Sequence, residues 1–450
     1  MRAQQKYYLV LGVGRSGCAA AALLLQRGQR VALCDDQVSF DEAVMARLRQ
    51  RIAQLSGLGV VELDFAGAAV EVSDYDVLVL SPGVALSHPL VRAAQQAGVL
   101  QTSELEIALQ GYGGRVVAIT GTNGKSTTVS MVAHILSKQQ SPCSLGGNLG
   151  TPVAELVCQR KLAALLILEV SSYQLEHSPR LSAQITVFLN FATDHLERHG
   201  SLRAYFLAKW QLVSNTPSGG VALIAREVAE AAERFLGAGA VAPSVCIVNE
   251  TTAESSTLGQ RAAQRLPHNH RNALFAVHAV KALGVPMSLV ELADSLCDFR
   301  GLEHRFEVVM SRLGGGEIIN DSKATNFAST RTSLACLTQP VILLLGGAKK
   351  AGDECTLTAA EKERVCAVLY FGASGQDLCA EMALTEIYTR IFPSLTALMA
   401  SLVYEASAFP GADILFSPGC ASFDEFQNFE DRGNAFKRMV KQVIEEESPS

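Results

Sequence analysis

Residues 116–128, which read VVAITGTNGKSTT, join an apolar run to a glycine-punctuated loop and the start of a helical stretch. Loops of this kind wrap backbone N–H groups around a polyphosphate, while a lysine such as Lys125 contacts the outer phosphates and a hydroxyl such as that of Ser126 binds Mg²⁺. The full eight-residue pattern has a glycine where this chain has Ile119, so the loop is a shortened variant. We predict a strand, an ATP-binding loop and a helix here, in preference to an ordinary turn.

The composition limits the classes of protein to which the chain can belong. Its 450 residues, 48% of them hydrophobic, are too many for one core and favour about three domains. A net charge of −6 with thinly spread basic residues argues against nucleic acid as the main partner. Eleven cysteines without a CxxC pair indicate reduced thiols, and no apolar run reaches the roughly 18 residues of a spanning helix. We expect a cytoplasmic protein.

A second glycine-rich loop lies near the start of the chain. A predicted strand, 7–11, leads into GVGRSG at 12–17 and a helix, and a second strand, 30–34, ends at Asp35. This pattern is the dinucleotide fingerprint of a Rossmann-like domain, and taken alone it indicates NAD or FAD. With the other phosphate loop downstream, it indicates only a Rossmann-like domain for some nucleotide-bearing ligand. The turn at 81–83, after a predicted strand at 76–80, is either a ligand-binding edge or a plain connection.

Polar residues follow two further buried strands. The predicted strand 165–168 delivers Glu169, and the strand 185–189 delivers Asn190 and His195. Because the carboxyl ends of parallel strands meet at one edge of a sheet, we expect these side chains beside the phosphate loop. A carboxylate in that place can hold Mg²⁺ or order its water shell.

Other segments are less decisive when the residues alone are considered. Lys209 lies on an otherwise apolar helix and is either a snorkelling lysine or part of a site. The glycine-rich segment 146–150 predicts a flexible stretch, and the polar segment 250–264 predicts irregular structure. Asn269 is placed to cap a helix that runs through residue 281.

The last third of the chain predicts another parallel sheet. Apolar runs at 317–319, 340–345, 367–371 and 413–419 alternate with helical patterns, which is typical of strands linked by crossover helices. The segment 298–307 marks the boundary before this domain.

Three segments together resemble the ATP-dependent Mur ligases of peptidoglycan synthesis, and the resemblance covers essentially the whole chain. They are TGTNGKST (120–127), LEVSSYQLE (168–176) and NFATDHLERH (190–199). Two more, NDSKATN (320–326) and SPGCASFD (417–424), resemble the branch of that family that adds D-glutamate. Folylpolyglutamate synthases share the central domain, but their phosphate loop lies near the start of the chain, whereas residues 1–115 precede it here.

The resemblance implies an α/β fold of three domains. These are a Rossmann-like domain for a UDP-sugar (1–104), a central P-loop ATPase-like parallel sheet (105–301), and a C-terminal Rossmann-like domain (302–450) that contributes ATP and D-glutamate contacts. It also implies a reaction in which ATP phosphorylates the carboxylate of UDP-N-acetylmuramoyl-L-alanine and the amine of D-glutamate displaces the phosphate. We expect a monomer, with neither nucleic acid nor a membrane as partner.

The resemblance further implies roles for single residues. Lys125, Glu169, His195 and Lys209 match the catalytic positions: Lys125 contacts the β and γ phosphates, Ser126 and Glu169 hold one Mg²⁺, and His195 and a carbamylated Lys209 hold a second. The nucleotide-binding matches are Gly121, Thr122, Asn123, Gly124, Lys125, Ser126 and Thr127 in the loop, and Asn269, Asn272, Arg305 and Asp321 around adenine and ribose. The substrate matches are Ser16, Asp35 and Gly83 for the UDP-sugar, Asn148 and His195 for its carboxylate, and Thr325, Lys350, Ser422, Phe423 and Phe429 for D-glutamate.

Some positions depart from the expected family pattern. Arg15 and the pair at 36–37 lie where the family varies, and Phe423 replaces a common leucine. Lys349 stands beside Lys350, so either lysine could bind D-glutamate.

Two other functions fit parts of the sequence. A nicotinamide-dependent oxidoreductase would use the glycines of 12–17 and Asp35, but it leaves Lys125, Glu169 and Lys209 without a role. A nucleotide-gated binding protein would use ATP only to clamp a partner.

Overall fold

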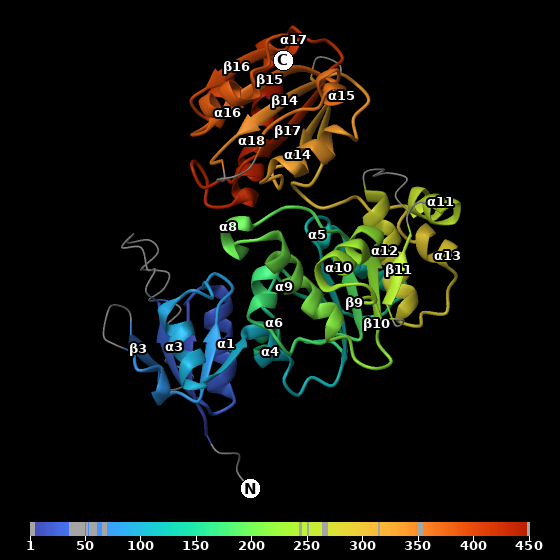
Figure 1. Ribbon diagram of the computed structural model, residues 1–450. Coiled ribbons are helices and arrows are strands. Elements are labelled where there is room, and N and C mark those ends of the chain that lie inside the picture. Colours follow the sequence, from blue (N-terminus) through green and yellow to red (C-terminus); the bar gives the residue numbers. More distant parts are fainter. Residues whose placement is uncertain are drawn as a thin grey trace. The chain divides into compact units, whose positions relative to one another are not determined.

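A computed structural model of the chain shows two compact units (Figure 1). The first comprises residues 1–264 and 269–298, and the second comprises 265–268 and 299–450. Within them the structure describes residues 5–35, 50, 53, 61–64, 70–242, 245–249, 252–262, 269–313, 316–349 and 354–447. The α/β class predicted from the sequence is confirmed, whereas the domain boundaries at 104/105 and 301/302 stay predictions.

The first unit begins with a five-stranded parallel sheet in the order β3-β2-β1-β4-β5. Its strands are β1 (Tyr7–Leu11), β2 (Arg30–Cys34), β3 (Val61–Asp64), β4 (Val77–Leu80) and β5 (Leu100–Ser103). The helical segments are α1 (Arg15–Gln26), η1 (Val72–Asp74), α3 (Pro89–Ala97) and α4 (Glu104–Leu109). The order reverses between β1 and β4, which is the point where such sheets bind ligands.

Two glycines of the first loop are required by close packing. A Cβ on Gly17 would lie 2.0 Å from the carbonyl oxygen of Gly12, which no real Cβ tolerates. Gly12 itself has a φ of +87°, and a Cβ there would lie 2.8 Å from the Cβ of Ser81. The fingerprint glycines therefore bring α1 and the turn after β4 against the end of β1.

The same unit continues with a six-stranded parallel sheet in the order β11-β10-β9-β6-β8-β7. Its strands are β6 (Arg115–Thr120), β7 (Ser144–Gly147), β8 (Leu165–Glu169), β9 (Ile185–Phe188), β10 (Val221–Ala225) and β11 (Val245–Val248). The helices are α5 (Lys125–Lys138), α6 (Val153–Cys158), α7 (Ser172–Glu176), α8 (Leu196–His199), α9 (Leu202–Ser214), α10 (Arg226–Leu236), α11 (Ala253–Ala262), α12 (His270–Ala282) and α13 (Leu289–Asp294). One hydrophobic core joins this sheet to α1, because Leu23 and Leu24 belong to the same cluster as Leu166 and Leu168.

Segment 146–150, which was expected to be flexible, begins with Gly146 and Gly147 at the end of strand β7; this strand pairs with β8 and places Asn148 directly after its end. One expectation for this sheet is wrong. The segment predicted to be irregular contains helix α11, which buries Leu258 and Ala262. The helix is mostly polar, and its apolar stripe is narrow. Packing of this stripe against the rest of the protein is enough to stabilise the helix.

The second unit contains a six-stranded sheet in the order β12-β13-β17-β14-β15-β16. Its strands are β12 (Glu307–Leu313), β13 (Gly316–Asn320), β14 (Val341–Gly346), β15 (Val365–Phe371), β16 (Tyr388–Phe392) and β17 (Asp413–Gly419). The helices are α14 (Phe327–Leu334), α15 (Ala359–Lys362), α16 (Gly375–Met382), α17 (Leu395–Ser407) and α18 (Phe429–Glu447). The expectation of an entirely parallel sheet is wrong at β12, which pairs antiparallel with β13. Only residues 314 and 315 separate these strands, too few for a parallel crossover.

Among the described residues, the structure has no helix that is both long and apolar enough to cross a bilayer.

Candidate active site

The predicted phosphate loop connects β6 to α5 and is shaped by glycines. Gly124 has a φ of +80°, and a Cβ on it would lie 2.1 Å from Oδ1 of Asn272. Helix α12 therefore brings Asn272 against the loop, as expected of a residue near the nucleotide. Asn269 occupies the predicted N-cap position, but its Oδ1 accepts a hydrogen bond from Nδ2 of Asn272 at 2.8 Å and does not cap the helix.

Asn190 fixes the backbone of the loop from the neighbouring strand. Its Oδ1 accepts from the N–H of Asn123 at 2.9 Å, and its Nδ2 donates to the carbonyl of Asn123 at 3.0 Å. The N–H of Thr122 donates to the carbonyl of Asn190 at 3.2 Å. The carboxyl ends of β6 and β9 are thus held together, as the shared sheet edge predicted.

A cluster of oxygen atoms lies at the ends of β6, β7 and β8. Ser126 Oγ donates a hydrogen bond to Oε2 of Glu169, and both residues are buried. Asn148 Nδ2 donates to Oε1 of the same carboxylate at 2.8 Å. A Cβ on Gly147 would lie 2.2 Å from the carbonyl oxygen of Glu169, so the close approach of the ends of β7 and β8 also requires glycine.

This oxygen cluster fits Mg²⁺ in the manner of a nucleotide site. Among the described residues no three His, Cys, Asp or Glu side chains gather to hold a metal. Mg²⁺ rarely needs such a cage, because one or two protein oxygens, substrate phosphates and waters complete its octahedron. A hydroxyl and a carboxylate beside a phosphate loop supply that minimal set.

Lys209 is buried, which excludes the reading as a snorkelling lysine. Only 1% of the residue is exposed, and its Nζ lies 3.0 Å from the carbonyl oxygen of Gly121 and 3.4 Å from Oγ1 of Thr120. Burial, together with the nearby charge of Lys125, lowers the pKa of Lys209 well below its usual value. Lys125 Nζ also donates to the carbonyl of Gly121, at 2.8 Å, so two lysines meet at one oxygen.

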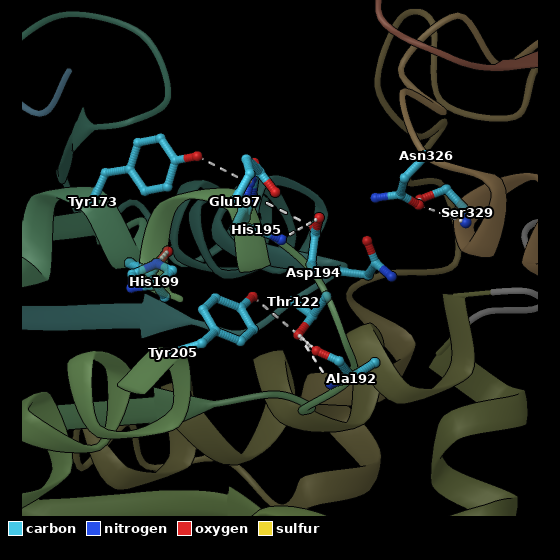
Figure 2. Close-up of polar contacts among 12 residues, drawn as sticks. Thr122, Tyr173, Ala192, Asp194, His195, Glu197, His199, Tyr205, Asn326 and Ser329 are labelled. Carbon is cyan, nitrogen blue, oxygen red and sulfur yellow. Dashed lines mark hydrogen bonds and ion pairs between the residues drawn. The ribbon is translucent and has the colours of Figure 1, made fainter. Parts of the chain in front are cut away.

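His195 lies on the segment that follows β9 and precedes α8. It stands at the N-cap position of α8 with a φ of +53°, and its N–H donates to Oδ1 of Asp194 at 2.9 Å. Its ring Nδ1 lies 3.2 Å from the hydroxyl of Tyr173. Figure 2 shows how the same segment is tied to the phosphate loop: Thr122 Oγ1 accepts from the N–H of Ala192 at 3.1 Å and lies 3.2 Å from the hydroxyl of Tyr205.

The two tyrosines were missed by sequence reasoning. Tyr173 and Tyr205 lie on the helical segments of α7 and α9, where an aromatic residue usually signals core packing. The motif SSYQLE carries Tyr173, and this was the only signal that could have found it.

A cavity of about 340 Å³ lies at the switch point of the first sheet. It brings together the three residues predicted for the UDP-sugar, Ser16, Asp35 and Gly83, and it is also lined by Arg15 and His88. Asp35 Oδ2 accepts a hydrogen bond from the N–H of Val13 at 2.7 Å, which fixes the carboxylate at the cavity wall. Sequence reasoning did not identify His88, whose ring caps α3 by accepting from the N–H of Leu90.

The second unit contains the other predicted residues. Asp321 is buried after β13, where it accepts hydrogen bonds from Oγ of Ser333 and Oγ of Ser417, both at 2.7 Å. Burial raises the pKa of Asp321 to about 6. Thr325 lies in the loop that follows, and Arg305 lies before β12.

The predicted D-glutamate residues differ in exposure. Ser422 is buried, whereas 76% of Phe423 is exposed. Phe429 is the first residue of α18, and the Nζ of Lys323 lies 3.6 Å from the centre of its ring. Lys349 forms an ion pair with Glu381, and Lys350 lies outside the described residues.

Comparison with known proteins identifies the family to which the chain is similar. Residues 119–285 match the family described as Mur ligase middle domain, and residues 6–102 match the Mur ligase MurD-like N-terminal domain. The UDP-N-acetylmuramoylalanine--D-glutamate ligase of Syntrophus aciditrophicus is 33% identical, over 96% of this chain and 97% of its own length. That of Koribacter versatilis is 32% identical, over 99% of this chain and 100% of its own length.

Solved structures agree at the level of the fold. The MurF ligase of Thermotoga maritima, crystallised in complex with ADP, superposes with a TM-score of 0.57 over 100% of both chains at 13% identity. The two D-glutamate ligases named above are 33% and 32% identical to this chain over nearly its full length. The chain therefore belongs to the Mur ligases, in the family of UDP-N-acetylmuramoylalanine--D-glutamate ligases.

Proposed function

We propose that the chain is the ATP-dependent ligase that joins D-glutamate to UDP-N-acetylmuramoyl-L-alanine in peptidoglycan precursor synthesis. The observation that carries this function is the gathering of the phosphate loop, Glu169 and Lys209 at one edge of the central sheet, in a chain related over its full length to D-glutamate ligases. Both nucleotide-bearing substrates favour a reaction in the cytoplasm.

The reaction must overcome the low reactivity of a carboxylate. An oxygen of the substrate carboxylate attacks the γ-phosphorus of ATP, the bond to the bridging oxygen breaks, and ADP leaves with that electron pair. The amine of D-glutamate then attacks the carbonyl carbon of the acyl phosphate. The tetrahedral intermediate loses phosphate and a proton to give the amide. Two anions must meet in the first step, so the site has to neutralise charge and exclude water.

The phosphate loop supplies the contacts to ATP. Its N–H groups and the N-terminus of α5 cradle the phosphates, while Lys125 exchanges the carbonyls of Gly121 and Thr122 for phosphate oxygens. Asn272, which abuts Gly124, and its partner Asn269 are the residues of α12 proposed for the nucleotide base and ribose. Arg305 and Asp321 are the nucleotide-binding residues proposed in the second unit.

Ser126 and Glu169 would hold one Mg²⁺, and His195 would help to hold a second. When bound, these ions neutralise the phosphate charge that builds up during transfer. The orientation of the Glu169 carboxylate is already fixed, because Asn148 donates to one of its oxygens and Ser126 donates to the other. Asn148 also lies at the end of β7, where its amide can orient the substrate carboxylate.

Lys209 is proposed to react with CO₂. Its amine nitrogen attacks the carbon of CO₂, a proton leaves the nitrogen, and the product is a carbamate anion. Only an unprotonated amine can do this, and burial beside Lys125 favours that form. The exchange of a cation for an anion would remove the repulsion between Lys209 and a neighbouring metal ion.

The remaining substrate contacts come from two other sheets. The cavity of the first sheet would take the UDP portion through Ser16, Asp35 and Gly83. The D-glutamate residues proposed in the second unit are Thr325, Lys350, Ser422, Phe423 and Phe429. Lys349 already has Glu381 as its partner, which favours Lys350 as the lysine that binds D-glutamate.

The test is phosphate release from ATP with each substrate omitted in turn. We expect release only when UDP-N-acetylmuramoyl-L-alanine and D-glutamate are both present, and we expect L-glutamate or L-alanine not to replace D-glutamate. Release with the UDP-sugar replaced by a folate would contradict the assignment. A nucleotide-gated clamp would bind ATP without this dependence, and an oxidoreductase would change the absorbance of added NAD(H).

A further inference from the structure

Arg198 lies one helical turn after His195, but its side chain points to a different part of the first unit. Its backbone N–H donates to the carbonyl oxygen of His195 at 3.1 Å, so the two residues share the single turn of α8. The side chain is only 11% exposed. A buried guanidinium needs partners for its five N–H donors, and those partners reveal its role.

One side of the guanidinium is anchored by a carboxylate. Arg198 Nε and Nη2 lie 2.9 and 2.8 Å from Oε2 of Glu176, and Nδ1 of His199 lies 2.8 Å from Oε1. Burial would raise the pKa of Glu176, but the hydrogen bonds from His199 and Arg198 outweigh it and hold that pKa below its usual value. The carboxylate therefore stays charged and fixes the orientation of Arg198.

The other side of the guanidinium binds the turn that follows β4. Arg198 donates to three successive carbonyl oxygens, those of Pro82 at 3.4 Å, Gly83 at 3.1 Å and Val84. His177 Nε2 joins it at the oxygen of Val84, at 2.9 Å. Burial lowers the pKa of His177, which favours the neutral ring. Because the carbonyl of Val84 can only accept, Nε2 carries the proton of that ring, and Arg198 Nη2 lies 3.3 Å from the same nitrogen.

This turn is a wall of the UDP-sugar cavity. Pro82, Gly83 and Val84 line the cavity, whereas Arg198 does not. In a trans peptide the C=O and N–H groups point in opposite directions, so carbonyls held by Arg198 leave the N–H groups of those peptides turned away from it. The guanidinium thus sets the orientation of the turn from outside the residues that line the cavity.

We propose that Arg198 is a positioning residue that fixes the UDP-sugar turn relative to His195, so that substrate bound in the first sheet presents its carboxylate to the central sheet. This inference rests on the proposed function, because it assigns the cavity to the UDP-sugar. The competing explanation is that Arg198 merely holds together the two halves of the first unit, which are the five-stranded sheet with its helices and the six-stranded sheet with its helices.

A second arginine separates these explanations, because it joins the same two halves away from the cavity. Arg180 Nη2 lies 2.8 Å from Oε2 of Glu106 and 3.2 Å from the carbonyl oxygen of Gln101, and its side chain is 53% exposed. A hydrogen bond between Ser103 and Ser178, at 2.7 Å, further joins the halves. Loss of Arg198 should therefore free the turn and leave the halves attached.

The experiment compares Arg198→Ala and Arg198→Lys with the control Arg180→Ala, using steady-state kinetics and thermal unfolding. A misplacement of about 1 Å can cost up to about a hundredfold in rate. We expect Arg198→Ala to raise the KM for UDP-N-acetylmuramoyl-L-alanine at least about tenfold and to lower kcat, with the KM for ATP within about threefold of the parent. Arg198→Lys keeps the charge beside Glu176 but not the fork that spans three carbonyls, so it should show the same selective rise in KM.

A rescue by small molecules adds a readout that a purely structural role would not give. Methylguanidinium should restore part of the kcat/KM lost in Arg198→Ala and should have no effect on Arg180→Ala. The proposal is overturned if a folded Arg198 variant keeps both kinetic constants within twofold of the parent, if it raises the KM for ATP equally, or if Arg180→Ala shows the same pattern. If Arg198→Ala does not fold, the KM values of Arg198→Lys decide alone. A parent enzyme that releases no phosphate with both substrates would refute the proposed function instead.

Discussion

Glu104 should make the first unit less stable as the pH rises. The residue begins α4, is only 4% exposed, and its Oε1 accepts from the N–H of Ala154 at 2.6 Å, at the start of α6. Burial raises the pKa of this carboxyl from 4.5 to about 7, although the N–H groups of Ala154 and Val153 act in the opposite direction. The proton is therefore bound more tightly in the folded chain than in the unfolded chain.

The sign and size of the effect follow from this difference. The stabilisation from protonated Glu104 is fully present below about pH 4.5 and is lost as the pH rises through about 7. Since each pKa unit is worth about 1.4 kcal/mol, the loss amounts to about 3 kcal/mol. Glu104→Gln keeps the oxygen that accepts from α6 and removes the titration. The variant should therefore gain about 3 kcal/mol relative to the parent between pH 4.5 and 8.

The chain provides its own probe for the assay. Trp210 is the single tryptophan, it is 7% exposed, and it lies on α9 of the first unit. Urea unfolding followed by its fluorescence at several pH values gives the free energy of unfolding for parent and variant. The control Glu230→Gln makes the same substitution at an exposed position on α10 and should not give the gain of about 3 kcal/mol expected of Glu104→Gln. A difference for Glu104→Gln that stays constant between pH 5 and 8, or that falls, would refute the reasoning.

Three substitutions test the candidate active site. Lys125→Ala should abolish phosphate release with little change in melting temperature, because the lysine contacts loop carbonyls outside the core; retained turnover would exclude the phosphate-loop role. Lys209→Ala should lose activity that acetate or formate partly restores by occupying the place of the carbamate, and failure of both acids would count against carbamylation. Gly124→Ala should weaken ADP binding by at least about tenfold in a fluorescence titration, because its Cβ would meet Asn272 at 2.1 Å and its φ of +80° disfavours alanine. Unchanged ADP affinity would contradict the loop geometry.

The sequence predicted those parts of the fold whose information is local. Strands β1, β6 and β8 each contain an unbroken apolar run that leads to a glycine-rich or acidic segment, so both the strands and the sheet edge at which they end could be inferred. The parallel arrangement then followed from the alternation of strands and helices. Strand β7 and helix α11 were missed because their stability depends on neighbours, β8 in one case and α12 in the other.

The candidate site was predictable in its motifs and not in its contacts. The phosphate loop and Glu169 could be placed together because the carboxyl ends of parallel strands meet at one edge of a sheet. Nothing in the sequence near Lys209 shows that its amine reaches the carbonyl of Gly121, since that contact joins residues 88 positions apart. The same holds for Arg198, whose motif was noticed but whose carbonyl partners lie in the turn after β4. Long-range contacts of this kind depend on how helices and strands pack against one another. The periodicity of apolar residues in the sequence predicts the elements but not this packing.

The transfer of an oxygen atom tests the central claim most directly, namely that the edge of the central sheet activates a carboxylate with ATP. UDP-N-acetylmuramoyl-L-alanine labelled with ¹⁸O in its terminal carboxylate is incubated with the enzyme, ATP and D-glutamate, and the released phosphate is analysed by mass spectrometry. Because the acyl phosphate breaks at the bond between carbon and oxygen, the account predicts one ¹⁸O atom in each phosphate released. Phosphate without the label, or label in AMP, would contradict it.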